Sequence, residues 1–526
     1  MRKPLSQLAS YQALRAHARE ISAHTLREWF ARDPGRFDQF SIEHEDFLFD
    51  YSRNRVSSKT LDKLLALFFE CEVEAWRDRL FAGSRINLTE SRAVQHTKLR
   101  DLGDVSSEPA KQRDDVLSRM IHLAERVSQA GFKDVVSLGS GGSRLGPELV
   151  CDAFSHAANK GLDIHFAGNA DASEINRVLE NLLPDRTFFI VTSKSFTTPE
   201  TLANAGTARS WLSSRQRAGK RIERHFCAVT AEVEKAVSWG IQPQLVFPLT
   251  GAVGGRFSVW SAAGLSIVLH LGMPAFMEFL QGAWEMDKHF KTATPRENVP
   301  ILLALLSIWN RHFLGTSAHA VLPYDTRLRL LPAYLQQLEM ESNGKCVDRE
   351  GRELDVPSSP VVFGDVGTNA QHGFFQFLHQ GTSTVSCDFI GVVRPGHSNR
   401  LQHDMLLANM VAQAEALMVG RLAEELRGNA GNQQTGHMLF PGNRSSSMIL
   451  LKELMPRTLG QLLALYEHKV FVEGVILNIN SFDQPGVELG KILAKRLFER
   501  LQEGKAPDSQ ENSATRAVLD YYRKHS

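Results

Sequence analysis

Short apolar runs alternate with helical segments between residues 101 and 285 of this 526-residue chain. The runs are rich in β-branched and aromatic residues, and they lie at Val135–Leu138, Ile164–Ala167, Thr187–Val191 and His225–Val229. Strands that alternate with helices favour a parallel sheet, because each strand must reach the next through a crossover that packs on the sheet. The pattern predicts a doubly wound α/β domain over residues 101–285.

The remaining residues predict three further parts. Residues 286–490 hold a second α/β set, with Val361–Phe363 and Val385–Val393 as its clearest strands. Residues 1–100 are mostly helical by pattern and predict an N-terminal helical addition, and residues 491–526 predict a C-terminal helical tail. We expect two doubly wound α/β domains with parallel-rich sheets, since a chain of this length exceeds one ordinary core.

Charge and cysteine content limit the partners and the compartment. The chain has 60 basic and 59 acidic side chains, so no overall field attracts nucleic acid or an anionic membrane. Five scattered cysteines without a C-x-x-C pair favour a reducing compartment and disfavour structural zinc. The N-terminus lacks the apolar core of a secretion signal, and Val299–Trp309 has about half the length of a membrane span. We expect a cytoplasmic protein that binds a small molecule and no metal.

A run of hydroxyl side chains follows the strand at Thr187–Val191. Residues 192–201 read T-S-K-S-F-T-T-P-E-T, and the segment after Glu200 is typical of a helix. Thr198 stands at the N-cap position and Pro199 at the first helical position, so free backbone N–H groups and the positive helix end should face one point. The run therefore indicates an anion site, although an ordinary turn rich in serine and threonine is the alternative.

A glycine loop precedes another predicted helix. Val135–Leu138 leads into G-S-G-G-S at residues 139–143, and Leu145–Phe154 has a helical pattern. The dinucleotide fingerprint requires glycine at the sixth position, which is Arg144 here, and no nucleoside triphosphate loop occurs in the chain. Two hydroxyl-bearing turns between strand and helix fit one phosphomonoester better than a nucleotide.

Two charged residues stand in unusual local settings. Arg256 follows two glycines in V-G-G-R-F-S and precedes an apolar helix, which suits stabilisation of developing negative charge. Glu341 lies near the predicted end of a helix at Gly344, where a negative charge is disfavoured, so its carboxylate is a candidate general base. The alternatives are an arginine bonded to carbonyls or a carboxylate, and a surface Glu341 paired with Lys345 four residues on.

Two further segments are weaker signals. A glycine turn enters a helix in G-T-N-A-Q-H, where we expect His372 in the first helical turn and His379 on much the same face. One of these histidines can equally be a bonded core residue. Lys491 follows a turn-rich helix entry, and composition alone favours an exposed ammonium there.

The conjunction of these segments resembles the glucose-6-phosphate isomerase family. The resemblance covers nearly the full chain in ten ordered motifs. They are F-D-Y-S-R-N-R-V, R-I-N-L-T-E-S-R-A-V, G-S-G-G-S-R-L-G-P, S-K-S-F-T-T-P-E-T, V-G-G-R-F-S, M-E-S-N-G-K, G-T-N-A-Q-H, P-G-N-R-S-S-S, Y-E-H-K-V-F and S-F-D-Q-P-G-V-E-L-G-K. The resemblance implies two sugar-isomerase (SIS) domains, a sugar phosphate substrate, no cofactor, and a homodimer whose active sites lie at the subunit interface.

The resemblance also implies roles for individual residues in interconverting glucose 6-phosphate and fructose 6-phosphate. Glu341 would move a proton between C2 and C1 through a cis-enediolate, Arg256 would stabilise that anion, and His372 with Lys491 would open the sugar ring. His372 would come from the partner subunit. The phosphate would be bound by Ser143, Ser193, Ser195 and Thr198 with backbone N–H groups near Gly142 and Lys194, and the sugar by Gln337, Gln484 and Gly255.

Departures from the family pattern are mild. Ser195 and Ala370 stand where the family often has threonine and glycine, and Ser140 and Arg144 replace a common isoleucine and aspartate. None removes a group that the chemistry needs. There are two alternative functions: a different phosphosugar isomerase or a mannose-accepting variant on the same fold, and a sugar-phosphate sensor without catalysis.

Overall fold

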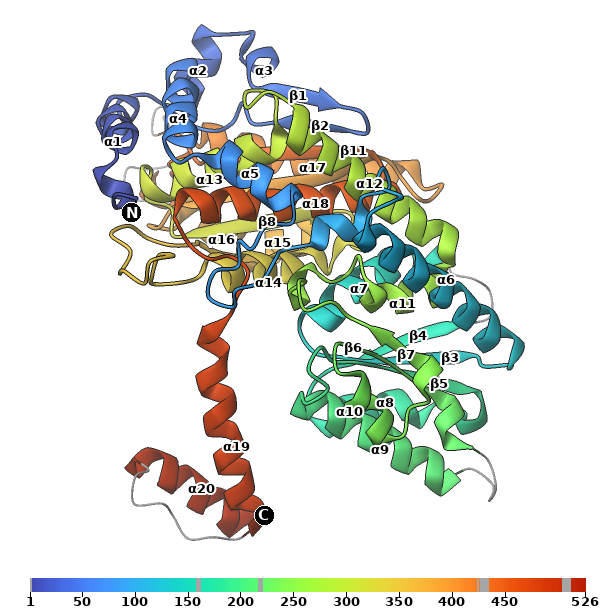
Figure 1. The fold of residues 1–526 in the computed structure, drawn as a ribbon. Helices are drawn as coiled ribbons and strands as arrows, with labels where there is room; N and C mark the ends of the chain where they lie inside the picture. Colours follow the sequence, from blue (N-terminus) through green and yellow to red (C-terminus); the bar gives the residue numbers. More distant parts are fainter. Residues whose placement is uncertain (1, 158–161, 216–220, 423–424, 426–434, 504–511) are drawn as a thin grey trace. The chain divides into compact units, whose positions relative to one another are not determined.

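The computed structural model describes residues 2–157, 162–215, 221–422, 425, 435–503 and 512–526. The chain divides into two compact units, Met1–Phe482 and Asp483–Ser526. Both sheets of the protein lie in the first unit (Figure 1). The sequence-predicted boundaries at residues 100, 285 and 490 remain predictions.

The smaller sheet contains five parallel strands in the order β4-β3-β5-β6-β7. The four strands predicted between residues 101 and 285 are confirmed, and β7 is a short fifth strand that was not predicted. The strands are β3 (Asp134–Leu138), β4 (Asp163–Ala167), β5 (Thr187–Thr192), β6 (Phe226–Thr230) and β7 (Val246–Pro248). The helices of this region are α6 (Glu108–Gln129), α7 (Gly142–Ala153), α8 (Ala172–Glu180), α9 (Pro199–Arg215) and α10 (Val233–Trp239).

The strand order of this sheet reverses between β3 and β5. Strand β4 pairs with β3 on one side, and β5 pairs with β3 on the other side. The loops that follow β3 and β5 therefore leave the sheet at neighbouring strand ends and run in opposite directions. Ligands of open parallel sheets bind at the carboxyl ends of the strands where the order reverses. The glycine loop and the hydroxyl-rich run follow these two strands, which places both predicted anion-binding turns at one edge.

The larger sheet has the order β1-β2-β11-β10-β8-β9. Its parallel strands are β8 (Ala318–Tyr324), β9 (Val361–Gly364), β10 (Val385–Arg394) and β11 (Ser446–Glu453), of which β9 and β10 were predicted. The hairpin β1 (Ser41–His44) and β2 (Phe47–Asp50) extends the sheet, since β2 pairs antiparallel with β11. The first hundred residues therefore supply two strands besides α1 (Ala9–Ile21), α2 (Leu26–Arg32), α3 (Arg36–Gln39), α4 (Ser58–Glu70) and α5 (Val73–Phe81).

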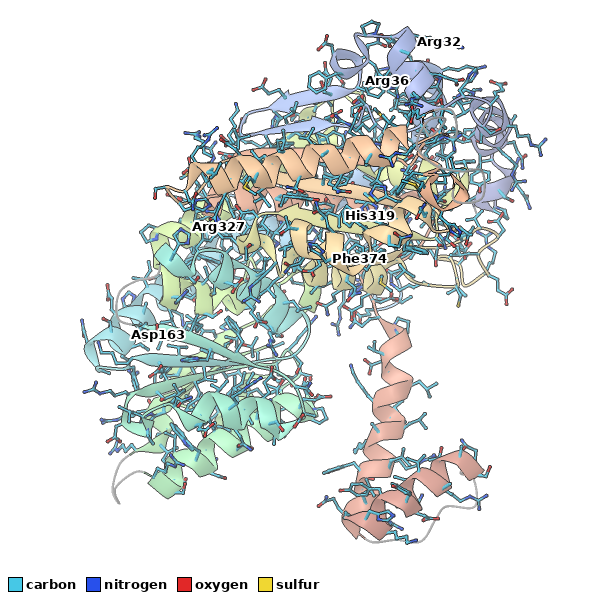
Figure 2. All side chains as sticks on the ribbon, turned by 180° about the vertical axis from the view of Figure 1, so that it is seen from behind. Arg32, Arg36, Asp163, His319, Arg327 and Phe374 are labelled. Carbon is cyan, nitrogen blue, oxygen red and sulfur yellow. The ribbon has the colours of Figure 1, made fainter. Side chains whose placement is uncertain are left out.

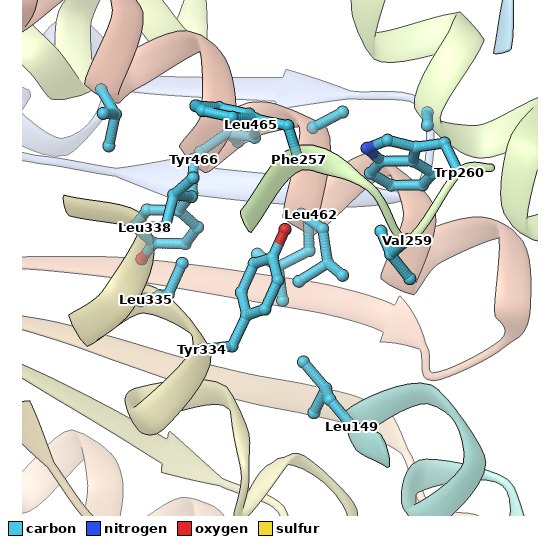
Figure 3. Close-up of a cluster of buried hydrophobic side chains, with 14 of the residues drawn as sticks. Leu149, Phe257, Val259, Trp260, Tyr334, Leu335, Leu338, Leu462, Leu465 and Tyr466 are labelled. Carbon is cyan, nitrogen blue, oxygen red and sulfur yellow. The ribbon is translucent and has the colours of Figure 1, made fainter. Parts of the chain in front are cut away.

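Helix α18 (Pro456–Ile476) lies at the centre of the main core, and every residue from Thr458 to Ile476 is buried. A helix that is buried all round packs on several neighbours at once. Figure 3 shows Leu462, Leu465 and Tyr466 of α18 in a cluster with Leu335 and Leu338 of α14 (Leu331–Asn343).

Two more helices pack on α18, namely α12 (Met273–Thr292) and α13 (Val299–His312). The helical tract predicted around Trp260–Trp284 is broken. Helix α11 (Leu265–Leu271) ends at Gly272, whose φ of 88° leaves the helical region, and Pro274 lies in the first turn of α12. Proline cannot donate the N–H that a continuous helix would require there, so the tract forms two helices.

The remaining helices of the first unit are α15 (Gly367–Gly373), α16 (Phe375–Gln380) and α17 (Arg400–Val419). The second unit contains α19 (Glu488–Glu503) and α20 (Ser513–His525). No helix in the described part of the chain combines the length and apolar character that a membrane crossing requires.

Candidate active site

The glycine loop after β3 packs directly against the segment that carries Arg256. A Cβ atom on Gly142 would lie 2.2 Å from the carbonyl carbon of Gly255 and 2.4 Å from the backbone nitrogen of Arg256. Only glycine permits this approach, because each distance is far below van der Waals contact. Gly142 starts α7, and Gly141 before it has a φ of 55°. The loop therefore brings the N-terminus of α7 beside Arg256.

The hydroxyl-rich run after β5 forms a compact turn. Ser193 Oγ and Thr198 Oγ1 are 2.9 Å apart, and Thr197 Oγ1 donates to Ser195 Oγ at 2.7 Å. Phe196 is buried at the centre of the turn with a φ of 48°, a strained conformation for a residue with a Cβ atom. Helix α9 begins at Pro199 as predicted, and Leu202 N–H donates to Thr198 O. The serine and threonine hydroxyls are thus gathered at the entrance to a helix.

Lys194 joins this turn to the segment before Arg256. Its ammonium donates to the carbonyl oxygens of Gly251 and Val253, both at 3.0 Å. Burial lowers the pKa of Lys194, and the charge of Arg92 lowers it further. The ammonium therefore donates its hydrogen bonds to backbone carbonyls. The group of Lys194 that we predict to bind an anion is its backbone N–H.

The two departures in the glycine loop make local contacts of their own. Ser140 Oγ donates to Gly168 O at 2.9 Å. Arg144 forms ion pairs with Glu148 and Glu174, each at 2.7 Å, and Glu174 also accepts the backbone N–H of Gly168. These residues tie the loop to the chain after β4.

Helix α14 runs from the glycine loop toward Arg256. A Cβ atom on Gly141 would lie 3.0 Å from Gln337 Nε2, so the Gln337 side chain reaches the loop. Glu341 is one helical turn further along α14, on the same face as Gln337. Helix α14 ends at Asn343 with Gly344 as its C-cap, as the sequence predicted. One helix face thus carries both a predicted sugar-binding amide and the predicted base.

Arg256 and Glu341 form an ion pair, with Arg256 Nη1 3.3 Å from Glu341 Oε2. The arginine side chain is 1% exposed and the glutamate side chain 23% exposed. Arg256 Nε donates to Ser342 Oγ at 2.7 Å, and Nη2 donates to Ser481 O at 2.6 Å. A buried, hydrogen-bonded guanidinium therefore stands beside a carboxylate that remains open to solvent.

The structure contradicts the alternative in which Glu341 pairs with Lys345, while its role as a base remains a prediction. Among the residues described, the ion pair of Glu341 is the one with Arg256, and not a helix-surface pair with Lys345. Lys345 Nζ donates to Ser342 O at 2.8 Å and to Asn480 O. Sequence reasoning missed Ser342 and Ser481 as partners of Arg256, although both lie inside motifs that also carry a predicted site residue.

His372 does not lie in the first turn of its helix, so that prediction is wrong. The helix already begins at Gly367, which packs so closely on the Tyr324 ring that a Cβ atom would lie 2.4 Å from it. Helix α15 is only seven residues long, which puts His372 in its last turn, exposed to solvent. Phe374, labelled in Figure 2, has a φ of −142° and separates α15 from α16.

The separation of the two helices also places His379 on α16, apart from His372. His379 Nε2 is 2.9 Å from Gln413 Oε1, so His379 is the bonded histidine of the two. No hydrogen bond or ion pair within the described residues joins His372 to Glu341 or Arg256.

Gln484 and Lys491 belong to the second unit. Lys491 Nζ lies 2.8 Å from Glu488 Oε1 on α19, and both side chains are exposed. The described residues contain no group of three or more His, Cys, Asp or Glu side chains suited to a metal ion. The first unit therefore brings together the two turns, Gln337, Arg256 and Glu341.

The chain is similar to proteins of one family along its whole length. The family model that matches, over residues 50–519, is described as phosphoglucose isomerase. The chain is 44% identical to the glucose-6-phosphate isomerase of Chlorobium luteolum, over 99% of this chain and 98% of that protein. It is also 44% identical to that of Cupriavidus metallidurans, over 98% of both. The crystal structure of a glucose-6-phosphate isomerase from Chlamydia trachomatis matches with a TM-score of 0.88 and 34% identity over 100% of both chains.

Proposed function

The chain belongs to the phosphoglucose isomerase family, and from this premise we propose how its residues carry out the family's reaction. The protein is an aldose-ketose isomerase that interconverts D-glucose 6-phosphate and D-fructose 6-phosphate, a step of glycolysis and gluconeogenesis. The observation that supports our assignment of roles is the ion pair between buried Arg256 and solvent-open Glu341 at the end of α14.

The substrate phosphate binds at the edge where β3 and β5 diverge. The hydroxyls of Ser143, Ser193, Ser195 and Thr198 donate hydrogen bonds to it, together with backbone N–H groups near Gly142 and Lys194. Helix N-termini and hydroxyls suit a dianion because their partial positive charge is fixed in place. The phosphate is remote from C1 and C2, so its binding energy orients the reacting carbons.

Glu341 removes the proton from C2 of the open aldose and returns it to C1. The cis-enediolate formed between these steps carries negative charge on oxygen, and Arg256 stabilises it. Arg256 is held by Ser342 and Ser481 before substrate arrives, so little reorganisation is required. Gln337, Gly255 and Gln484 contact the sugar hydroxyls. Moving one proton within the substrate requires no redox cofactor.

Ring opening precedes this transfer and uses His372 and Lys491. His372 is exposed on α15 and makes no hydrogen bond or ion pair with Glu341 or Arg256 within the described residues. This exposure supports a homodimer in which His372 completes the active site of the partner subunit. All five cysteines are free, which fits the reducing environment of the cytoplasm, where we infer that the enzyme works.

A coupled assay tests the function. Purified protein is given glucose 6-phosphate, and fructose 6-phosphate is measured through its onward phosphorylation. The assay is repeated with mannose 6-phosphate as substrate and as competitor, which distinguishes a glucose enzyme from a variant that also accepts mannose. If the protein converts neither glucose 6-phosphate nor mannose 6-phosphate, the proposed function is contradicted.

A further inference from the structure

Two of the buried ionisable side chains of α18, Lys469 and Glu473, meet the carboxyl group of Glu339 on α14. Lys469 Nζ lies 2.7 Å from Glu339 Oε2 and 2.9 Å from Glu473 Oε1. The exposed fractions of Glu339, Lys469 and Glu473 are 3%, 2% and 2%. This cluster, Glu339–Lys469–Glu473, takes no part in the reaction described above.

The cluster holds one cation and two carboxyl groups away from water. An uncompensated buried charge is costly, so one of the two acids must be neutral. The hydrogen bonds agree. Glu339 Oε1 and both carboxyl oxygens of Glu473 are buried and make no well-aligned hydrogen bond, although Lys469 Nζ lies 2.9 Å from Glu473 Oε1. A proton on one carboxyl group supplies the missing donor, which then bonds to the other acid.

The surroundings decide which acid is neutral. Burial raises the pKa of Glu339, but the charge of Lys469 and the hydrogen bonds from Glu473 and Lys469 together outweigh this, and the net shift is downward. Burial raises the pKa of Glu473 well above its ordinary value, and the Glu339 carboxylate raises it further. Lys469 donates to Glu339, and the pair supplies the charged half of the cluster. Glu473 is therefore the neutral member.

The other polar groups near the cluster come from the elements packed around it. Ser307 of α13 is a neutral polar neighbour that lowers the pKa of Glu473, although burial and Glu339 prevail. His319 of β8, labelled in Figure 2, lies 3.0 Å from Asp388 of β10, and Tyr466 donates to the same Asp388 oxygen. Asp388 thus has hydrogen-bond partners of its own, but the cluster also acts on its surroundings: Lys469 lowers the pKa of Asp388, and His319 lowers the pKa of Glu339.

The cluster fixes the rotation of α14 relative to α18. Apolar contacts such as those of Leu335 and Leu338 with Leu462 (Figure 3) are non-directional, so they tolerate rotation better than hydrogen bonds do. Glu339 and Glu341 are two residues apart, about 200° around the helix. Anchoring Glu339 to α18 therefore turns Glu341 away from the core and toward Arg256.

We propose that Glu473 is a neutral acid bonded to Glu339, and that Glu339, Lys469 and Glu473 are positioning residues that hold Glu341 in place for proton transfer. The positioning role rests on the proposed role of Glu341 as the base. The protonation of Glu473 is independent of that role and can be tested separately.

The first experiment replaces the neutral acid by a neutral amide, Glu473→Gln. At pH values between the pKa of Glu473 in the unfolded chain and its higher pKa in the folded protein, only the folded state binds the proton. The free energy of unfolding therefore decreases as the pH rises through this range. We expect the Tm of the wild-type protein to fall more between pH 6 and pH 9 than that of the variant. Infrared spectra at neutral pH should show the C=O stretch of a protonated carboxylic acid in the wild type and lose it in Glu473→Gln. An equal pH dependence and an unchanged acid band would overturn the neutral acid.

The second experiment compares kcat and KM for two matched amides. Glu473→Gln preserves the charge of the cluster and should keep both constants within about twofold. Glu339→Gln forces Glu473 to ionise and weakens the anchor on α14, so kcat should fall about tenfold while KM stays within about twofold, because the phosphate turns are untouched. His468→Gln removes a buried contact between α18 and Asp287 of α12 and serves as the control with normal kcat. Normal kcat in Glu339→Gln would overturn the positioning role, whereas an active Glu341→Gln protein would instead overturn the role of the base.

Discussion

Arg256 and Glu341 meet at 3.3 Å with very different access to solvent, 1% exposed for the arginine side chain and 23% for the glutamate. The guanidinium is fixed by Ser342 and Ser481, so it cannot turn away when the carboxylate moves. The carboxylate, by contrast, belongs to a partly exposed side chain that a ligand can reach from solvent. A fixed cation beside a partly exposed carboxylate is the arrangement that the proposed enediolate chemistry requires.

Glu341→Gln should abolish isomerisation and the exchange of the C2 proton with solvent, while sugar phosphate binding stays within a few fold. The amide keeps the shape of the side chain but cannot take the proton. Exchange is measured by NMR in deuterated buffer and binding by calorimetry. Glu353→Gln, an exposed change outside the site, is the control. Retained exchange at C2 would remove Glu341 from the role of base.

Arg256→Ala should lower kcat by about two to three orders of magnitude, the usual effect of losing one donor that stabilises transition-state charge. Ser342→Ala should have a smaller effect of about tenfold, because Arg256 loses only its 2.7 Å bond from Nε to the serine hydroxyl. Steady-state kinetics of both variants test this order. An effect on KM alone would place Arg256 in substrate binding and not in catalysis.

Gly142→Ala should separate the glycine loop from the Arg256 segment. The added methyl group would lie 2.2 Å from a backbone carbon of Gly255, so one of the two segments must move. We expect a loss of stability of about 1–3 kcal/mol, typical of overpacking, and a fall in kcat of at least about a hundredfold from the misplaced arginine.

Gly206→Ala is the matched control for that variant. Gly206 lies within α9, and a Cβ atom there has no neighbour within 4 Å. Alanine in a helix interior is favoured over glycine, so this variant should gain up to about 1 kcal/mol and keep full activity. Thermal unfolding and kinetics of the two proteins are compared. Equal behaviour of both would show that the contact between Gly142 and Gly255 is unimportant.

Much of the smaller sheet was predictable because its strands are short apolar runs between turns rich in glycine and hydroxyl residues. The same local logic located the start of α9 at Pro199 and the end of α14 at Gly344. Such signals lie within a few residues of the structure that they determine. They were sufficient to identify both turns, although the roles of their residues in binding phosphate remain predictions.

Features that depend on distant residues were not predictable. The pairing of β2 with β11 joins residues about four hundred positions apart, and the four residues of β2 are too few for a clear period. The bond from Arg256 to Ser481 also spans 225 residues, and no local pattern encodes it. His372 was misplaced within its helix because α15 already begins at Gly367, which packs against Tyr324 of another element.

The proposed exchange of His372 between subunits gives a test that no single variant provides. Glu341→Gln and His372→Ala proteins, each inactive alone, are mixed, unfolded and refolded together. If His372 acts in the partner's site, each mixed dimer contains one doubly defective site and one intact site. Random pairing makes half of the dimers mixed, so about a quarter of wild-type activity should return. Native mass spectrometry confirms that mixed dimers form. If mixed dimers are present and turnover stays absent, both residues act within one subunit.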